Sequence, residues 1–362
     1  MNFIFTGFFI SAILCHLIIR YQRFHSHFTA DPSIGTQKFH ELDTPRVGGL
    51  AIYISLIMMW LTTHETNHTG SSLVPLFLIC LPVFIMGLLE DVTKKISVKL
   101  RLIAAMGTGI LAFIFYDAKI LRIDIPFIDQ YLSLIYISAI FSIVAIAGLS
   151  NAYNLIDGFN GLASMVGIIA LSAITYIALR VGDQVIMFQS LAMIAALLGF
   201  FIWNYPRGLI FLGDGGAYLV GSYIAILSVL LVFRHQEISP WFALMVSAYP
   251  ITETLFTIFR RLIFKRNPGL PDAAHFHTLI YRQIVRWTIF SVPKLNNNKA
   301  KNAATSPYLW ALSSLGVFPA IIFWHSSTAL MCSAVLYYLF YIATYQWLIH
   351  FRRRRRALAS GL

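Results

Sequence analysis

Residues 213–233 read GDGGAYLVGSYIAILSVLLVF, which places one carboxylate, Asp214, among glycines directly ahead of a long apolar run. Apolar runs of this kind are typical of transmembrane helices. A carboxylate at a helix start lies beside exposed backbone N–H groups, which favour phosphate, and it can bind a metal ion there. It can also be a simple helix cap. The stretch predicts a membrane helix that begins either at a functional site or at a cap.

Composition extends this prediction to the whole chain. Of its 362 residues 58% are hydrophobic and only 12% are charged, and the mean hydropathy is +0.73. These values exclude an ordinary soluble domain and indicate one polytopic membrane domain covering residues 1–362. The net charge of +12 could suggest nucleic-acid binding. The basic residues lie between apolar runs, where membrane orientation and anionic lipid account for them, so no nucleic-acid partner is expected.

Eleven apolar runs approach the length needed to cross a bilayer, which predicts an all-α integral membrane protein with about eleven transmembrane helices. The runs are 3–19, 47–63, 73–89, 102–116, 134–149, 162–179, 186–203, 217–233, 241–259, 307–324 and 328–349.

Alternating the connecting loops between the two faces gives one face 23 of the 27 lysines and arginines. The positive-inside rule therefore predicts an external N-terminus and a cytoplasmic C-terminus. It also places a long loop, 260–306, and a basic tail, 351–362, in the cytoplasm. On the external side, alternating residues around Pro126 in segment 119–130 predict a short hairpin.

Six carboxylates lie near the ends of apolar runs, and the topology puts five of them on the cytoplasmic face: Glu90, Asp91, Asp157, Asp214, Asp272 and Glu253. A charge at bilayer depth costs roughly 2.5–3.5 kcal/mol on insertion scales, so acids at these borders favour a functional role. Several acids at one membrane face indicate a divalent-metal site that handles phosphates. The Glu90–Asp91 pair precedes four cations, including Lys99, that can hold phosphate oxygens.

Two further segments carry directional polar groups. Residues 151–161, NAYNLIDGFNG, offer Asn151, Asn154, Asp157 and Asn160 with glycines that allow close backbone approach, more than a simple turn requires. The basic loop carries His275 and His277, and upstream cations such as Arg266 favour an anionic ligand over zinc.

The ordered motifs TPRVGG (44–49), Glu90–Asp91, NAYNLIDGFNGL (151–162), NYPRGLIFLGDGGA (204–217) and HFH (275–277) resemble those of the polyprenyl-phosphate N-acetylhexosamine-1-phosphate transferases. The resemblance covers about residues 44–282. It implies a helical bundle in the bacterial inner membrane with a cytoplasmic active site. It implies transfer of a sugar-1-phosphate from a UDP-sugar to undecaprenyl phosphate, with Mg²⁺ as cofactor and Mn²⁺ as the alternative ion. The product would start lipid-linked glycans of the O-antigen type.

Residue by residue, the resemblance implies that Asp214, with Asp91, binds the metal. It implies that Glu90 and Asp91 bind metal or deprotonate the lipid phosphate. The remaining positions fall at nucleotide-sugar, uridine and diphosphate contacts: Asn151, Asn154, Asp157, Asn160, Asn204, Phe211, His275 and His277.

Three positions depart from the family pattern. Glu90 and Asn160 stand where aspartates are usual, and Thr278 replaces the last histidine of an HxHH pattern, which places the chain nearer the O-antigen initiators than the peptidoglycan branch. A secondary transporter is the alternative function, but its acids would lie near the bilayer midplane in related halves. The sequence leaves the oligomeric state open, a homodimer included.

Overall fold

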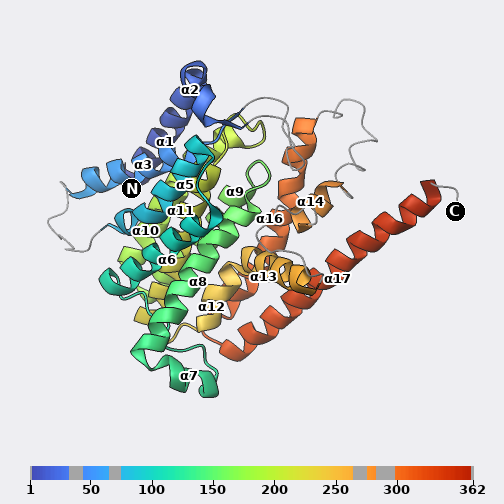
Figure 1. Cartoon of the computed structure of the whole chain (residues 1–362). Helices are drawn as coiled ribbons and strands as arrows, with labels where there is room; N and C mark the ends of the chain where they lie inside the picture. The colour runs from blue at the N-terminus through green and yellow to red at the C-terminus, as the bar shows by residue number, and fades with distance from the viewer. Residues whose placement is uncertain (1, 32–43, 65–74, 264–274, 283–297, 360–362) are drawn as a thin grey trace.

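The computed structural model describes residues 2–31, 44–64, 75–263, 275–282 and 298–359, and almost all of them are helical. Helices α2 and α7 lie at opposite ends of the helical bundle (Figure 1). The elements are α1 Asn2–Arg20, α2 Gln22–Thr29, β1 Ala30–Asp31, β2 Thr44–Pro45, α3 Gly48–His64, α4 Leu76–Ile79, α5 Leu81–Thr93, α6 Val98–Phe115, α7 Pro126–Leu132, α8 Ile135–Ile156, α9 Leu162–Val181, α10 Gln184–Asn204, α11 Gly213–Arg234, α12 Pro240–Val246, α13 Ala248–Ile263, α14 Phe276–Ile280, α16 Asn298–Ile322 and α17 Ser327–Ala359.

The prediction of an all-α membrane protein is confirmed. Among the described residues seven helices are long and apolar enough to cross a membrane, and nine if each of two bent pairs is one span. Helical segments occupy all eleven predicted runs wherever the chain is described, but some of them, such as α4 and α5, are short. The count of eleven spans and the orientation stay predictions.

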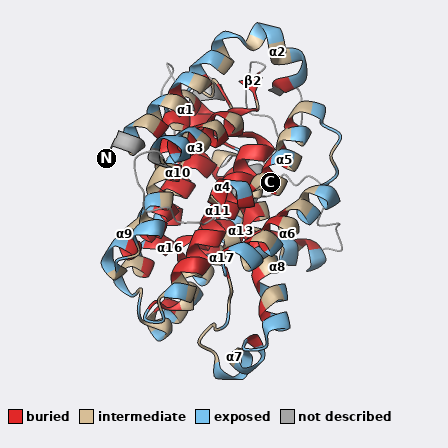
Figure 2. Cartoon of the chain, turned by 90° about the vertical axis from the view of Figure 1, so that its left-hand side faces the viewer, coloured by how far each residue is buried: buried red, intermediate tan, exposed pale blue. Residues whose placement is uncertain are grey.

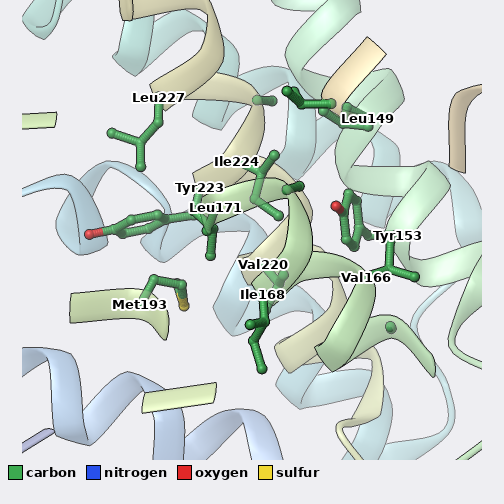
Figure 3. Packing of buried hydrophobic residues seen from close by; sticks show 14 of the residues in the cluster. Leu149, Tyr153, Val166, Ile168, Leu171, Met193, Val220, Tyr223, Ile224 and Leu227 are labelled. Atoms are coloured by element: carbon green, nitrogen blue, oxygen red, sulfur yellow. The ribbon is translucent and has the colours of Figure 1, made fainter. Parts of the chain in front are cut away.

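Helix α11 forms the centre of the bundle. Its residues are buried continuously from Gly213 to Leu231, and Figure 2 shows the helix as a red core among paler neighbours. Side chains of α8, α9 and α10 pack around it, as Figure 3 shows for Tyr153, Ile168 and Met193 on different sides of α11. Since α11 carries Asp214 in its first turn, the core fixes the position of that carboxylate.

Glycines allow the first turn of α11 to approach two other helices at backbone distance. A Cβ placed on Gly49 of α3 would lie 2.4 Å from the Cα of Gly216, and one on Gly87 of α5 would lie 2.6 Å from the Cα of Gly215. No side chain fits at such distances. This contact brings the starts of α3 and α11 and the end of α5 together at one point.

Caps explain several helix boundaries. The side chains of Ser97, Asp183 and Ser239 accept backbone N–H bonds at the starts of α6, α10 and α12. Gly182 ends α9 in the left-handed region, with φ 79°.

The predicted straight run 241–259 is bent. Helices α12 and α13 meet at 81°, with Ser247 between them. Pro250 lies in the first turn of α13, where a missing N–H group costs nothing, so a new helix starts there instead of continuing the old one.

Three other segments differ from the sequence prediction. The external hairpin prediction is wrong, because Pro126 starts helix α7 and the Asp129 carboxylate folds back onto the N–H of Ile123. Helix α16 begins at Asn298, within the predicted loop 260–306, because Asn302 and Ser306 bond to the backbone of the loop before α9. The predicted tail 351–362 continues α17 as helix to Ala359.

Candidate functional site

Asp91, at the end of α5, caps the first turn of α11. Its two carboxylate oxygens accept the backbone N–H groups of Asp214 and Gly215 at 2.8 and 2.9 Å. The Asp91 side chain is almost fully buried, and the glycine contact described above holds the two helices at this distance. Asp91 therefore positions Asp214 directly, and two carboxylates, those of Asp91 and Asp214, lie at the start of α11.

Two arginines converge on Asp214. Arg46 donates to one carboxylate oxygen at 2.8 Å and lies 3.6 Å from Asp91, while Arg101 of α6 donates to the other Asp214 oxygen. The backbone of Arg46 is fixed in place, because its N–H group donates to the carbonyl of Thr29, the last residue of α2. The arrangement joins two acids and two guanidinium groups, the side chains best suited to bidentate contacts with phosphate.

Glu90 and Lys99 lie at the edge of this cluster. One Glu90 oxygen accepts the N–H group of Ile96 at 2.7 Å and so holds the turn between α5 and α6, where Lys94 adopts φ 55°. Glu90 remains half-buried, and Lys99 is exposed in the first turn of α6.

The loop after α8 brings a third acid. The Asp157 side chain is half-buried, and this burial raises the pKa of its carboxyl to about 7, while the positive charge of Arg46 opposes part of the rise. Asp157 also acts electrostatically on Asp91, so it belongs to the same cluster. Within the described chain, neither Asp157 nor Asn154 has a hydrogen bond from its side chain. Asn151 accepts a bond from Tyr218 at 3.3 Å.

The other predicted asparagines act as ties between loops. Asn160 is buried, and its side chain donates to the carbonyl of Pro206 at 3.1 Å. The Asn204 amide accepts from Gly161 at 2.5 Å and donates to the carbonyl of Ile210 at 2.7 Å. Both side chains are engaged by the protein itself, and their contact with substrate stays a prediction.

Phe211 is half-buried, and its backbone lies against β2 and the start of α3, on either side of Arg46. Its N–H group donates to the carbonyl of Pro45 at 2.8 Å, and its own carbonyl accepts from Gly48 at 2.9 Å.

The histidine pair lies against the Asp157 loop. The rings of His275 and His277 stack with centroids 5.2 Å apart, and His277 also meets the Phe159 ring at 5.5 Å. A Cβ on Gly158 would lie 3.3 Å from Nε2 of His277. Burial and the neighbouring His275 lower the pKa of His277 to about 4, so that ring is neutral near pH 7. Its Nδ1 atom is buried and has no hydrogen-bond partner among the described residues.

The donors fit a hard divalent cation. Mg²⁺ and Mn²⁺ prefer oxygen ligands, and Mg²⁺ is usually held by one or two carboxylates together with substrate phosphates. Asp214 and Asp91 supply two carboxylates at one helix start. Within the described ranges no group of three or more His, Cys, Asp or Glu side chains could hold a metal by itself. The residues present therefore fit a metal that shares its coordination with phosphate.

Sequence reasoning found most of the acids but missed their partners. Arg46 and Arg101 were visible only as members of motifs and of the basic face, and their contact with Asp214 spans 168 and 113 residues of chain. Glu253 stood out as an acid near a span but was not assigned to the site. Arg266 and Asp272 lie outside the described residues.

Comparison with known proteins identifies the relatives of this chain. Residues 73–232 match the model of glycosyl transferase family 4. A "Probable undecaprenyl-phosphate N-acetylglucosaminyl 1-phosphate transferase" of Bacillus subtilis is 32% identical over 67% of this chain and 66% of its own length. An undecaprenyl-phosphate alpha-N-acetylglucosaminyl 1-phosphate transferase of Thermotoga maritima is 29% identical over 70% of this chain and 73% of its own. A phospho-N-acetylmuramoyl-pentapeptide-transferase of Streptococcus pneumoniae is 32% identical over 62% of this chain and 69% of its own.

Proposed function

Because the chain belongs to glycosyl transferase family 4, we propose that it transfers an N-acetylhexosamine-1-phosphate from a UDP-sugar to undecaprenyl phosphate and releases UMP. The product would start a lipid-linked glycan of the O-antigen type at the cytoplasmic face of the bacterial inner membrane. The relatives named for N-acetylglucosaminyl transfer make UDP-GlcNAc the first donor to test, with 6-deoxy amino sugars next.

The observation that carries the proposal is the cluster of Arg46 and Arg101 on the Asp214 carboxylate, with Asp91 and Asp157 beside it. The reaction joins two anions, so cations are needed to offset their repulsion, and catalysis consists largely of positioning and charge stabilisation. Two guanidinium groups can bind phosphate oxygens of donor and acceptor when these enter.

Asp214 and Asp91 are the residues that would hold Mg²⁺ or Mn²⁺. A bound divalent cation would neutralise phosphate charge at the point where the arginines also contact the substrates. Asp91 has a second task that does not depend on the metal, because it caps the helix that carries Asp214.

In the proposed reaction an oxygen of the lipid phosphate attacks the phosphorus that bears the sugar. A new P–O bond forms there, the P–O bond to the UMP phosphate breaks, and the electron pair leaves with UMP. Asp157 or Glu90 would accept the proton of any lipid phosphate that arrives protonated, since the second pKa of a phosphate monoester is about 6. His277, whose Nε2 atom faces Gly158 and whose buried Nδ1 atom has no hydrogen-bond partner among the described residues, offers a polar contact to the sugar or diphosphate.

A panel of UDP-sugars tests the proposal directly. Purified protein with Mg²⁺ and undecaprenyl phosphate is expected to release UMP and to form a lipid-linked sugar diphosphate with at least one UDP-N-acetylhexosamine. UMP release that does not require undecaprenyl phosphate, or transport of the UDP-sugar into vesicles without UMP release, would exclude the proposed reaction.

A further inference from the structure

Glu253 of α13 is a completely buried acid near the histidine pair that the proposed reaction does not use. It accepts three hydrogen bonds, two on one carboxylate oxygen and one on the other. Oε1 accepts from Nδ1 of His275 and from the N–H group of Phe276, both at 3.1 Å, and Oε2 accepts from the hydroxyl of Tyr341 at 2.8 Å. A buried carboxylate with three donors on it is a fixed structural centre.

The bond to Glu253 decides which nitrogen His275 presents to its surroundings. Because Nδ1 donates its proton to the carboxylate, Nε2 is the nitrogen left to contact another group. The orientation of the ring is then fixed, and the stacked His277 ring with it. The same logic applies to metal-binding and catalytic histidines, in which a carboxylate on one nitrogen orients the other.

Tyr341 links this carboxylate to the last helix, α17. Its ring stacks on Phe276 with centroids 4.7 Å apart and meets Phe256 of α13 at 5.4 Å. The short helix α14 is thereby linked to α13 through Glu253 and to α17 through Tyr341, and it also packs against α16. The position of the histidines thus depends on a residue far along the chain from every motif of the site.

We infer that Glu253 and Tyr341 are positioning residues of the reaction: Tyr341 fixes the Glu253 carboxylate, and Glu253 fixes His275 and the docking of α14. This inference rests on the proposed function for its kinetic consequence, whereas its structural consequence stands independently. The hydroxyl of Tyr341 acts only through Glu253 and touches no substrate.

Tyr341→Phe tests this inference, because it removes one hydroxyl and keeps the ring contacts. A bond to a charged group is lost, so kcat for UMP release is expected to fall on the order of tenfold, with KM for the UDP-sugar within about twofold. Glu253→Gln keeps the shape but removes the charge, and a larger fall in kcat, on the order of a hundredfold, is expected.

Tyr337→Phe is the matched control. Tyr337 is also buried on α17, but its hydroxyl has no hydrogen-bond partner among the described residues, so its removal should leave kcat unchanged.

A double-mutant comparison separates positioning from general destabilisation. In a His275→Ala background, Tyr341→Phe should have no further effect on kcat, because the residue through which it acts is gone.

Hydrogen–deuterium exchange of segment 275–282 provides a readout that needs no activity. Exchange should be several-fold faster in Tyr341→Phe than in wild type and in Tyr337→Phe. Equal exchange in the two tyrosine variants would overturn the inference, and so would an undiminished effect of Tyr341→Phe in the His275→Ala background. A wild-type protein without transferase activity would instead count against the proposed function, and the exchange result would still decide the docking of α14.

Discussion

The two ends of the bundle both carry buried or half-buried ion pairs, but they use them differently. At the α7 end, Arg122 donates to Asp124 at 2.6 Å and to the backbone carbonyls of Gln236 and Ile238, both at 2.7 Å. Asp124 also accepts from Ser327, at the start of α17. The Arg122–Asp124 pair lies within one loop, and the other contacts tie that loop to residues 236–238 and to the start of α17.

At the other end, the charges face one another across three helices instead of closing a loop. Asp214 binds both arginines, the Asp157 carboxylate has no hydrogen bond within the described chain, and the buried Nδ1 of His277 has no partner there. The comparison teaches that the number of ion pairs does not mark a site. Ionisable groups gathered from several helices at one point, with a carboxylate to which the described protein gives no hydrogen bond, mark it here.

The largest effect is expected from Asp214→Asn. The substitution keeps the size of the side chain but removes the charge that two arginines and the proposed metal share, so activity should fall by about a thousandfold. Initial rates of UMP release over a range of Mg²⁺ concentrations measure it, with the elution profile in detergent as a control for folding. A rate near wild type at moderate Mg²⁺ would remove Asp214 from the site.

Arg46→Lys should give a smaller loss. Lysine keeps the charge but lacks the planar fork that lets Arg46 lie near both Asp214 and Asp91, so kcat/KM is expected to fall by about ten- to a hundredfold. Steady-state kinetics with each substrate varied in turn would show which phosphate depends on the arginine. An unchanged kcat/KM for both substrates would contradict the assigned contact.

The pH dependence of activity tests Asp157. With a pKa of about 7, its ionised fraction should rise about tenfold between about pH 6 and about pH 8, and activity should rise with it. In Asp157→Asn the rise should be smaller, and the remaining pH dependence should follow the lipid phosphate, with a pKa of about 6, and Asp91, whose pKa burial also raises to about 7. A wild-type profile that is flat above about pH 6 would exclude a role for the Asp157 carboxylate.

The same group makes a prediction about stability. Burial raises the pKa of Asp157 above its ordinary value of 3.8, so the folded protein holds this proton more tightly than the unfolded chain does. The contribution of Asp157 to the free energy of unfolding should therefore decrease as pH rises from about 4 to about 7. Thermal unfolding of wild type and Asp157→Asn across this range measures the difference, and parallel curves would contradict it.

The smallest effect on activity is expected at the opposite end, from Arg122→Gln. The loss of bonds to Asp124 and to two carbonyls should lower the unfolding temperature by a few degrees, since each such bond contributes about 1 kcal/mol. Activity per folded molecule should stay within about twofold of wild type, because no proposed substrate contact lies there. A loss of activity without a loss of stability would show that the two ends are not independent.

The sequence alone was sufficient to predict features that depend on the residues within one segment. Apolar runs predicted the helices, and acids at their borders predicted Asp91, Asp157 and Asp214 as neighbours. It was not sufficient where a distant contact overrides the local pattern. Asn302 and Ser306 extend α16 into the predicted loop, and the break at Ser247 with Pro250 in the following turn divides a run that is apolar on both sides.

The arginine partners of the acids also could not be identified from the sequence, and the reason is physical. Arginines at membrane borders are common because they orient the protein, so Arg46 and Arg101 carried no separate signal until the fold placed them on Asp214. Asn160 and Asn204 show the converse, because the sequence motifs carried no signal of their bonds to the backbone of other loops.

The glycine contacts at the start of α11 restrict how this protein can be engineered. Replacement of a helical glycine by alanine usually stabilises a protein by about 0.4–1 kcal/mol, so such positions are common targets for producing sturdier membrane proteins. At Gly49 and Gly87 a methyl group would meet the backbone of Gly216 and Gly215 and push apart the helices that bring Arg46 and Asp91 to Asp214. A stabilisation screen scored only by yield or melting temperature could therefore select proteins with a displaced active site, and positions 49 and 87 should be left out of it.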